Sequence, residues 1–237
     1  LLSNMIIGSG FIAKNFENYN DDLERLNICL YAAGISNSQT QDKNLLDKEK
    51  NKFIEFLKKF NQKKKLIYIS TCSINDPSRN KNPYVVNKLY IEDLVQKNIK
   101  NFLIMRLPEV VGKNENKATL INFLNNKIKN GEKFEIWSKA KRNIIDIDDA
   151  ILLTINLLEN KNLNNTIINV ANPKSYFVTE IVKNFEKLYN MKANYNLVDR
   201  GQDNWHLDTN KILEISKKIK INFNENYLYE LLKKYYF

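Results

Sequence analysis

Apolar and polar residues alternate with two different periods along this chain. Short apolar runs with the character of β-strands occur at residues 4–7, 27–33, 65–71, 101–107 and 166–171. Between them, apolar positions repeat with the 3.6-residue period of an amphipathic helix over residues 45–60, 84–97 and 148–160. Strands that alternate with helices are typical of a parallel sheet covered by helices on both faces. The pattern therefore predicts an α/β fold.

The length of the chain limits how many domains it can form. Its 237 residues suit one domain, or one domain with a smaller lobe. With six Gly and four Pro, no segment has the composition of a flexible linker. We expect a sheet domain over residues 1–170, followed by a small helix-rich lobe over residues 171–237.

Charge and cysteine content exclude several classes of protein. The net charge of +10 comes from Lys residues that are spread along the chain, and no nucleic-acid-binding motif accompanies them. The densest basic cluster, residues 58–65, is interpreted as the solvated end of a helix. No apolar run is long enough to span a membrane, and no signal peptide is expected. Cys29 and Cys72 lack paired spacing, which favours a reducing cytoplasm.

A glycine-rich turn follows the first predicted strand. Residues 8–13 read GSGFIA, a G-x-G-x-x-A pattern between strand and helix. Gly8 would permit a tight turn, Gly10 would let the backbone approach a pyrophosphate, and Ala13 would let the helix pack closely on the sheet. The first helical N–H groups would then face the anion. An ordinary tight turn of an α/β protein is the structural alternative.

Tyr84 and Lys88 lie four positions apart, directly after Pro83. Residues with this spacing share one face of a helix, so the phenol and the ammonium could point to the same spot. A helical turn that carries both residues by chance is the alternative.

These motifs together resemble the short-chain dehydrogenase/reductase superfamily, in its extended branch of nucleotide-sugar epimerases, dehydratases and ketoreductases. In family order they are GSGFIA (8–13), LYAAG (30–34), YISTCS (68–73), PYVVNK (83–88), RLPEVVG (106–112) and RNIIDIDDA (142–150). The resemblance runs from about residue 5 to 211. It implies a Rossmann-type dinucleotide-binding domain over 1–170, with NADP or NAD as cofactor. Residues 171–237 would form the substrate-binding lobe, and 111–142 would contribute in part to the substrate cleft.

The resemblance also implies roles for three catalytic residues. Tyr84 would be the general acid/base, Lys88 would lower its pKa and hold the nicotinamide ribose, and Thr71 would hydrogen-bond the reacting oxygen. A free phenol has a pKa near ~10. A nearby ammonium favours the phenolate, so proton transfer becomes feasible near neutral pH.

Residues expected at the cofactor and the substrate follow from the same resemblance. The cofactor would contact Gly8, Ser9, Gly10, Phe11, Ile12, Ala32, Ala33, Gly34, Ser70, Tyr84, Lys88 and Leu107. The substrate would contact Ser73, Arg142 and Arg200, because a guanidinium fork suits a diphosphate better than an ammonium does. For Arg142 the alternative is a salt bridge to Asp146 or Asp148.

Other polar residues have structural interpretations. Arg106 stands at a strand end, and Asp148 and Asp149 precede a helix that they would cap. The single histidine, His206, lacks a second ligand, so no metal site is expected. Trp205 and His206 could line the substrate cleft or an exposed loop.

The sequence departs from the family in three places. Cys72 and Ser73 follow Thr71 where the dehydratases carry an Asp-Glu pair. Tyr84 lies only 13 positions after Thr71, which shortens the loop over the substrate. Another 13 residues, 14–26, separate Ala13 from the next strand, so the second strand and its helix have no room.

We therefore expect a shortened enzyme that acts on a nucleotide-linked sugar, as a 4-ketosugar reductase or an epimerase of surface polysaccharide biosynthesis. The alternative is a catalytically idle Rossmann-like protein that binds a nucleotide sugar. The expected partner is the nucleotide sugar, with no nucleic acid and no membrane, and a homodimer stays open.

Overall fold

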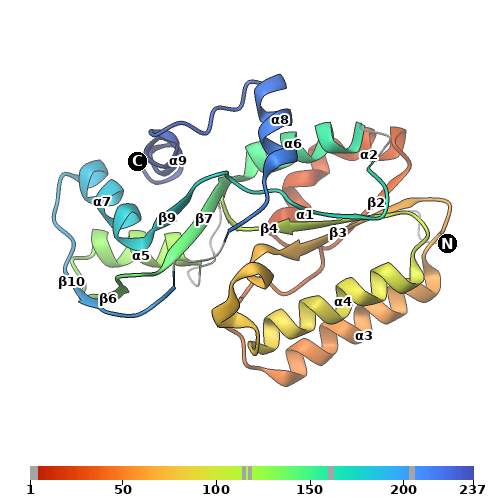
Figure 1. Cartoon of the computed structure of the whole chain (residues 1–237), viewed down its shortest axis with the longest axis horizontal. Helices are drawn as coiled ribbons and strands as arrows, with labels where there is room; N and C mark the ends of the chain where they lie inside the picture. Colours follow the sequence, from red (N-terminus) through yellow and green to blue (C-terminus); the bar gives the residue numbers. More distant parts are fainter. Residues whose placement is uncertain (1–4, 114–115, 117–118, 160–162, 203–205) are drawn as a thin grey trace. The chain divides into compact units, whose positions relative to one another are not determined.

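The chain forms two compact units (Figure 1). The computed structural model describes residues 5–113, 116, 119–159, 163–202 and 206–237. The first unit contains the chain up to Leu107 together with Ile151–Val170, and the second contains Pro108–Ala150 and Ala171–Phe237. The expected single boundary at residue 170 therefore differs from this division. Residues 108–150 belong with the C-terminal segment because their strands pair there.

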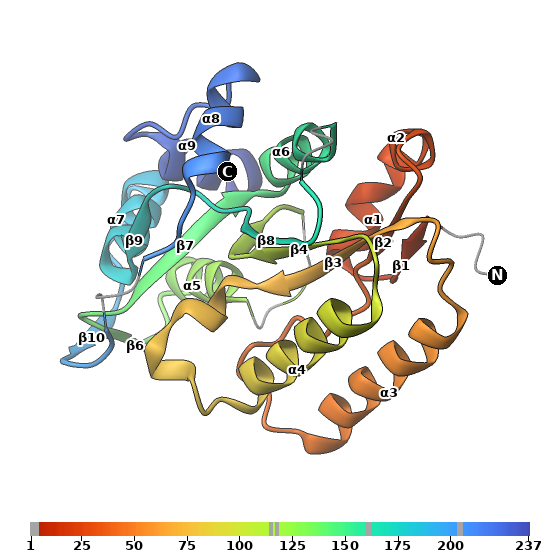
Figure 2. The ribbon, with the colours of Figure 1, turned by 45° about the vertical axis from the view of Figure 1, so that its right-hand side comes forward.

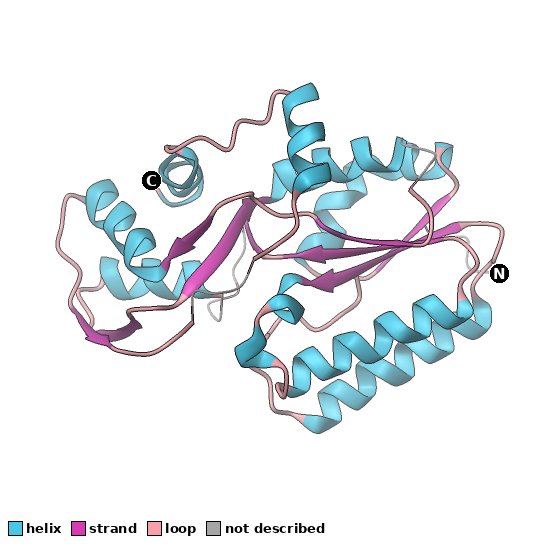
Figure 3. Ribbon diagram, in the orientation of Figure 1, coloured by secondary structure: helices cyan, strands magenta, loops and turns pink. Residues whose placement is uncertain are grey.

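The first unit is built on a five-stranded parallel sheet (Figure 3). Its strands stand in the order β1-β2-β3-β4-β8, and every neighbouring pair is parallel. The strands are β1 (Ile6–Ile7), β2 (Ile28–Tyr31), β3 (Lys65–Thr71), β4 (Phe102–Leu107) and β8 (Thr166–Asn169). Each falls inside a predicted strand, and Asn4 of the first prediction lies outside the described residues. The predicted α/β fold with a parallel sheet is confirmed.

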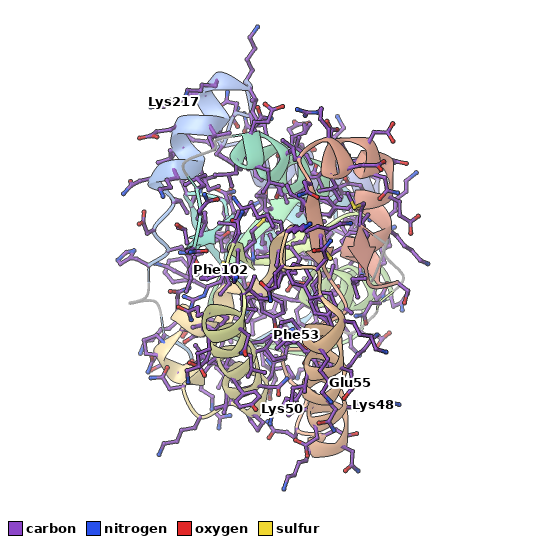
Figure 4. All side chains as sticks on the ribbon, turned by 90° about the vertical axis from the view of Figure 1, so that its right-hand side faces the viewer. Lys48, Lys50, Phe53, Glu55, Phe102 and Lys217 are labelled. Carbon is purple, nitrogen blue, oxygen red and sulfur yellow. The ribbon has the colours of Figure 1, made fainter. Side chains whose placement is uncertain are left out.

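One face of this sheet is covered by α3 (Lys43–Lys59) and α4 (Pro83–Asn98). Phe53 of α3 and Ile91 of α4 are buried in one cluster with the odd-numbered β2 residues Cys29 and Tyr31. Figure 4 labels Phe53 on the inner side of α3, while Lys48 and Glu55 of the same helix are exposed to solvent. The 3.6-residue apolar pattern of residues 45–60 thus marks the helix face that meets the sheet.

The opposite face is covered by α1 (Phe11–Phe16), α2 (Asn20–Arg25) and the first-unit part of α6 (Ile147–Glu159) (Figure 2). The even-numbered β2 residues Ile28 and Leu30 are buried on this side. Two connections run in the same direction along the sheet, one from β1 to β2 and one from β2 to β3. They cross opposite faces of the sheet. They therefore have opposite hands, although about 98% of such crossovers are right-handed.

The predicted loss of the second strand and its helix accounts for this unusual pair of crossovers. From α1 the chain passes through a short 3-10 helix, η1 (Glu17–Tyr19), and α2 directly into β2. β2 then pairs with β1, and Ile6 aligns with Leu30. Among the described residues, β1 is consequently an edge strand of the sheet.

The second unit contains two small sheets and its own core. A three-stranded sheet has the order β5-β7-β9, and β10 pairs in parallel with β6. These strands are β5 (Glu109–Val111), β6 (Phe134–Trp137), β7 (Lys141–Asp146), β9 (Ser175–Phe177) and β10 (Tyr195–Val198). The helices are α5 (Leu120–Lys129), α7 (Val178–Tyr189), α8 (Asn210–Lys218) and α9 (Tyr227–Tyr236). Apolar residues of α5, α7, α9 and the strands form one buried cluster.

Candidate active site

The glycine turn joins the end of β1 to α1. Gly8 has φ +143°, and a Cβ placed on it would lie 2.6 Å from the carbonyl oxygen of Ala32. The N–H of Ala32 in turn donates to the carbonyl of Ile7 at 2.8 Å. Gly8 is therefore required both for its backbone conformation and for the close approach of the β1 and β2 ends.

Gly10 occupies the N-cap position of α1 and faces open space. It has no side chain to bond the first helical N–H groups, and a Cβ on it would meet no atom within 4 Å. Ser9 is exposed, Phe11 and Ile12 are half-buried, and Ala13 is fully buried against the sheet. These features fit the pyrophosphate of a dinucleotide, because its oxygens need exposed N–H groups and room for the backbone to approach.

The carboxyl ends of β1 and β2 lie at a position where open α/β sheets commonly bind ligands. The chain leaves β1 toward one face and β2 toward the other, and ligands bind outside the carboxyl ends of strands at such a point. The expected cofactor residues Ala32, Ala33 and Gly34 follow the end of β2, and Leu107 ends β4. No neighbouring strand beyond β1 is present among the described residues to carry an acid for the adenosine ribose.

Tyr84 and Lys88 lie in the first two turns of α4. Asn82 caps this helix by accepting from the N–H groups of Tyr84 and Val85, and Pro83 supplies a fixed φ at the first position. Both Tyr84 and Lys88 are buried, and the Lys88 Nζ lies 5.5 Å from the centre of the Tyr84 ring. The expected sharing of one helix face is therefore confirmed.

The Lys88 ammonium also has a partner that was not expected. Its Nζ donates to Glu49 Oε1 at 2.7 Å, and both side chains are buried. Glu49 also accepts from the Asn87 side chain and from the N–H of Ile35. The sequence contained a signal for this residue, because Glu49 stands on the apolar stripe that includes Leu46 and Phe53.

Gly34 separates the ion pair from solvent. A Cβ on Gly34 would lie 2.3 Å from Lys88 Nζ and 2.8 Å from Glu49 Oε1. The glycine itself is exposed. The ammonium is thus covered on this side by a residue without a side chain.

Two further tyrosines flank the pair. Burial raises the pKa of Tyr31 to about 12, and it also raises the pKa of Tyr68. Both hydroxyls lack a hydrogen-bond partner among the described residues. Burial opposes the charge of Lys88, but Tyr68, Tyr84 and the Glu49 carboxylate favour the ammonium, so the pKa of Lys88 is raised.

The end of β3 carries the expected hydroxyl residues. Thr71 is buried and its Oγ1 accepts from the N–H of Ser73 at 3.1 Å, which caps the 3-10 helix η2 (Cys72–Asn75). Helix α4 packs against both β3 and η2, so Thr71 and Tyr84 belong to adjoining elements. The Ser70 hydroxyl donates to Glu92 at 2.6 Å and is buried.

Arg106 is engaged in the interior of the first unit. It makes two bonds to the Glu92 carboxylate, at 2.9 and 2.6 Å. This bidentate pair ties β4 to α4 and agrees with a structural role for Arg106. Cys72 is also buried there, and its Sγ donates to the Arg106 carbonyl at 3.2 Å.

The two substrate arginines belong to the second unit. Arg142 lies on β7 opposite Tyr176, and Arg200 is exposed after β10. The Arg200 carbonyl accepts from the N–H of Lys139, three residues before Arg142. Gly201 permits this approach, because a Cβ on it would lie 2.6 Å from the Ala140 nitrogen. The fold therefore brings the two segments together.

The acidic residues at the start of α6 have roles that differ from the expected ones. Asp146 is the residue that caps the helix, since its Oδ1 accepts from the N–H of Asp148 at 3.0 Å. Asp148 and Asp149 lie in the first turn, so the expected capping role was wrong while favourable pairing with the helix dipole is retained. Asp146 and Asp148 both bond Lys234 of α9 at 2.7 Å.

The described residues were compared with the patterns of a metal site and of a membrane-spanning helix. Three or more His, Cys, Asp or Glu side chains are nowhere grouped as a metal site there. His206 is exposed, and Trp205 lies outside the described residues. Among the helices that the structure describes, none is both long and apolar enough to cross a membrane.

The comparison with protein families assigns the chain to a class. The profile of the NAD dependent epimerase/dehydratase family matches residues 28–171, which is more than half of the 237 residues. The chain belongs to this family. The match begins after the glycine turn of residues 8–13, so the proposed role of this turn in cofactor binding is supported only by the geometry described above. No curated protein sequence matches the chain.

Solved structures of nucleotide-sugar enzymes share the fold. UDP-glucuronic acid 4-epimerase from Bacillus cereus, solved with UDP-glucuronic acid and NAD, has a TM-score of 0.68 at 19% identity, covering 96% of this chain and 77% of that one. RMD from Pseudomonas aeruginosa, solved with NADPH, has a TM-score of 0.70 at 14% identity, covering 97% and 98%. UDP-glucose 4-epimerase from Thermus thermophilus, solved with NAD, has a TM-score of 0.68 at 15% identity, covering 93% and 79%.

Proposed function

We propose that the protein is an NAD(P)-dependent enzyme that acts on a nucleotide-linked sugar, as a 4-ketosugar reductase or an epimerase in surface polysaccharide biosynthesis. The observation that carries this proposal is the pair of Tyr84 and Lys88 on α4, with Lys88 Nζ 5.5 Å from the Tyr84 ring. Membership of the epimerase/dehydratase family supports the same class of reaction.

In this proposal each catalytic residue has one task. The nicotinamide, when bound, supplies or accepts the hydride. Tyr84 donates the proton to the sugar oxygen or accepts it from that oxygen. The Lys88 ammonium places a positive charge beside the Tyr84 phenol, and the Thr71 hydroxyl orients the reacting oxygen. The Thr71 Oγ1 already accepts from the N–H of Ser73, which leaves its own proton available for donation.

The cofactor proposed is NADP or NAD, since the neighbouring structures hold NAD or NADPH. Gly8 and Gly10 with the first N–H groups of α1 would hold the pyrophosphate. Lys88 would reach the nicotinamide ribose with the N–H donors that Glu49 does not use. No strand lies beyond β1 among the described residues, so none of them would supply the usual acidic partner of the adenosine ribose from that position.

The proposed substrate contacts are Arg142 and Arg200 for the diphosphate, with Ser73 nearer the sugar. Two guanidinium groups on converging segments provide several N–H donors in planar forks, which match phosphate oxygens. The diphosphate would thus be held by residues of the second unit.

We do not expect the protein to eliminate water from a sugar. Cys72 follows Thr71, and burial raises the pKa of its thiol well above neutral pH. It therefore cannot replace a carboxylate as an acid–base group. Incubation with NAD and a nucleotide-linked hexose should give no product lighter by 18 mass units, and such a product would place the protein among the dehydratases.

A cytoplasmic location is part of this proposal, because Cys29 and Cys72 are buried and form no disulfide with each other.

Exposed apolar residues on two helices favour a homodimer. Val86, Leu89 and Tyr90 lie on one side of α4, and Leu45 at the start of α3 is also exposed. Leu89→Glu should convert a dimer to a monomer in size-exclusion chromatography with light scattering. A monomeric wild type would rule out the dimer.

The rival function is a nucleotide-sugar-binding protein without activity. An activity assay distinguishes the enzyme from the inactive binding protein. A panel of 4-ketosugar nucleotides is incubated with NADPH or NADH, and the absorbance of the reduced nicotinamide is followed. Epimerase activity would be detected with NAD by the change of sugar configuration in NMR spectra. Thermal stabilisation by a nucleotide sugar, without turnover in either assay, would favour the rival.

A further inference from the structure

The ion pair between Glu49 and Lys88 is buried inside the first unit. The two side chains are each 3% exposed, and Nζ lies 2.7 Å from Oε1. Glu49 comes from α3 and Lys88 from α4, so the bond joins the two helices on one face of the sheet. Asn87 and the N–H of Ile35 occupy further lone pairs of the carboxylate.

The other charged and titratable groups around Lys88 are few. Tyr31 and Tyr68 approach from β2 and β3, and Tyr84 comes from α4 itself. Burial raises the pKa of Tyr31 and of Tyr68, so both stay neutral at physiological pH. Glu92, also on α4, is compensated by its bidentate bond to Arg106 of β4.

Glu49 is therefore the carboxylate that compensates Lys88 among the described residues. A buried ion pair contributes little net stability compared with apolar side chains of similar size. Helix α3 places Glu49 between Leu46 and Phe53, where an apolar residue would continue the stripe. Stability alone does not explain a carboxylate at this position.

We infer that Glu49 is a positioning residue for the reaction: it fixes the Lys88 ammonium against the Tyr84 ring and keeps the proton on the Tyr84–Lys88 pair in the resting protein. This inference rests on the proposed function only in assigning Tyr84 as the acid. In this inference a carboxylate 2.7 Å from Lys88 Nζ favours an ammonium on Lys88 over a phenolate on Tyr84, so the phenol is available as a proton donor.

A resting phenol suits the reduction of a ketone. The carbonyl carbon would gain a hydride supplied by a reduced nicotinamide cofactor, which would be oxidised, and the carbonyl oxygen would gain the proton of Tyr84. The C=O double bond becomes a C–O single bond, and the phenolate then takes a proton from water. Glu49 thus favours the reductase of the two proposed activities.

Removing the Glu49 charge should release a proton from the pair at lower pH. In Glu49→Gln the buried ammonium loses its counter-ion, so either Lys88 deprotonates more easily or Tyr84 ionises to replace the carboxylate. Tyr84 and Lys88 together lose two protons as the pH rises. We expect the titration midpoint of the first loss to fall by at least about one pH unit, which is a tenfold loss of proton affinity.

The measurement uses the full chain without cofactor or substrate, and so does not depend on the proposed function. NMR spectra of protein labelled with 13Cζ-Tyr and 13Cε-Lys would follow both groups with pH, and Tyr84→Phe and Lys88→Met would assign their signals. Glu92→Gln is the matched control, because it removes another buried carboxylate of the same unit that belongs to Arg106. Glu49→Asp keeps the charge and should restore most of the wild-type midpoint.

A fall in Glu49→Gln that is absent in Glu92→Gln supports the inference. Equal midpoints in Glu49→Gln and the wild type would overturn it. If Glu49→Gln does not fold, the titration of Lys88 in the wild-type protein is the test. Its titration midpoint should lie above the ordinary lysine value of about 10.4. A midpoint below that value would overturn the inference. If the shift is present but the wild type turns over no nucleotide sugar, the proposed function fails and the inference about the Glu49–Lys88 pair stands.

Discussion

The Glu49 carboxylate bonds the Lys88 ammonium at 2.7 Å across 39 residues of sequence. The lysine that was expected to serve Tyr84 and the nicotinamide ribose is therefore already held by a negative charge. Its field at Tyr84 is reduced accordingly, and the positive charge of an oxidised nicotinamide becomes more important for ionising the phenol. The proposed catalytic pair of Tyr84 and Lys88 is therefore joined by Glu49 in a three-residue unit.

Gly34→Ala should disrupt this unit. The added methyl would lie 2.3 Å from Lys88 Nζ and 2.8 Å from Glu49 Oε1, so one of the two side chains must move. We expect a loss of about 1–3 kcal/mol in the free energy of unfolding, as for other overpacked sites. Denaturant unfolding measures it, and a variant as stable as the wild type would show that the ion pair rearranges freely.

Gly10→Ala is the matched control for this change. Its Cβ meets no atom within 4 Å, and the residue has a φ of −83° that alanine adopts. The free energy of unfolding should change by less than about 0.5 kcal/mol. Dinucleotide affinity should nevertheless fall, because the methyl occupies the space through which the backbone would approach the pyrophosphate. Unchanged affinity would remove Gly10 from the proposed site.

Binding of free dinucleotide should be weak and poorly selective. In the part of the chain that the structure describes, β1 is the edge strand and no further strand supplies an acidic residue, so the adenosine ribose would lack its usual partner. Asp21 and Asp22 belong to α2, and Lys14, four residues after Gly10, is the proposed donor to a 2′-phosphate. Isothermal titration with the four dinucleotides should give dissociation constants above ~10 µM, or about −7 kcal/mol.

A submicromolar constant for one dinucleotide, with rejection of its 2′-phosphate counterpart, would contradict this expectation. It would mean that another segment rebuilds the adenosine pocket.

Arg142→Lys and Arg200→Lys should each weaken nucleotide-sugar binding while leaving dinucleotide binding unchanged. Lysine keeps the charge but loses the planar fork, and the expected loss is about tenfold for a bidentate phosphate contact. Arg25→Lys is a suitable control, because Arg25 is exposed and pairs with Asp22 and Glu159. Competition against a fluorescent nucleotide sugar measures the effect, and equal affinity in all three variants would remove both arginines from the site.

The spacing of apolar residues predicted the strands and helices of the first unit well, because each of these elements has its own local apolar pattern. Residues 84–97 were predicted as a helix, and α4 covers Pro83–Asn98 with Asn82 as its cap. The length of segment 14–26 predicted the loss of a strand, since thirteen residues cannot hold a helix, a strand and a second helix.

The second unit was predicted less well, because its strands are short and pair across long distances in the sequence. β9 (Ser175–Phe177) has three residues and pairs with β7, more than 30 residues earlier. No local period marks such a strand. Glu49 was missed for a related reason: its position on an apolar stripe was visible, but its partner Lys88 is identified only by the fold.

Tyr84 is proposed to transfer the proton in a reaction on a nucleotide-linked sugar. The direct test is kcat of Tyr84→Phe with the nucleotide sugar that the wild type turns over, beside dinucleotide affinity measured by calorimetry. Tyr90→Phe, an exposed tyrosine of the same helix, is the control. We expect a fall of at least ~10²-fold in kcat for Tyr84→Phe, with the dissociation constant unchanged within about twofold. Turnover comparable to the wild type would contradict the claim.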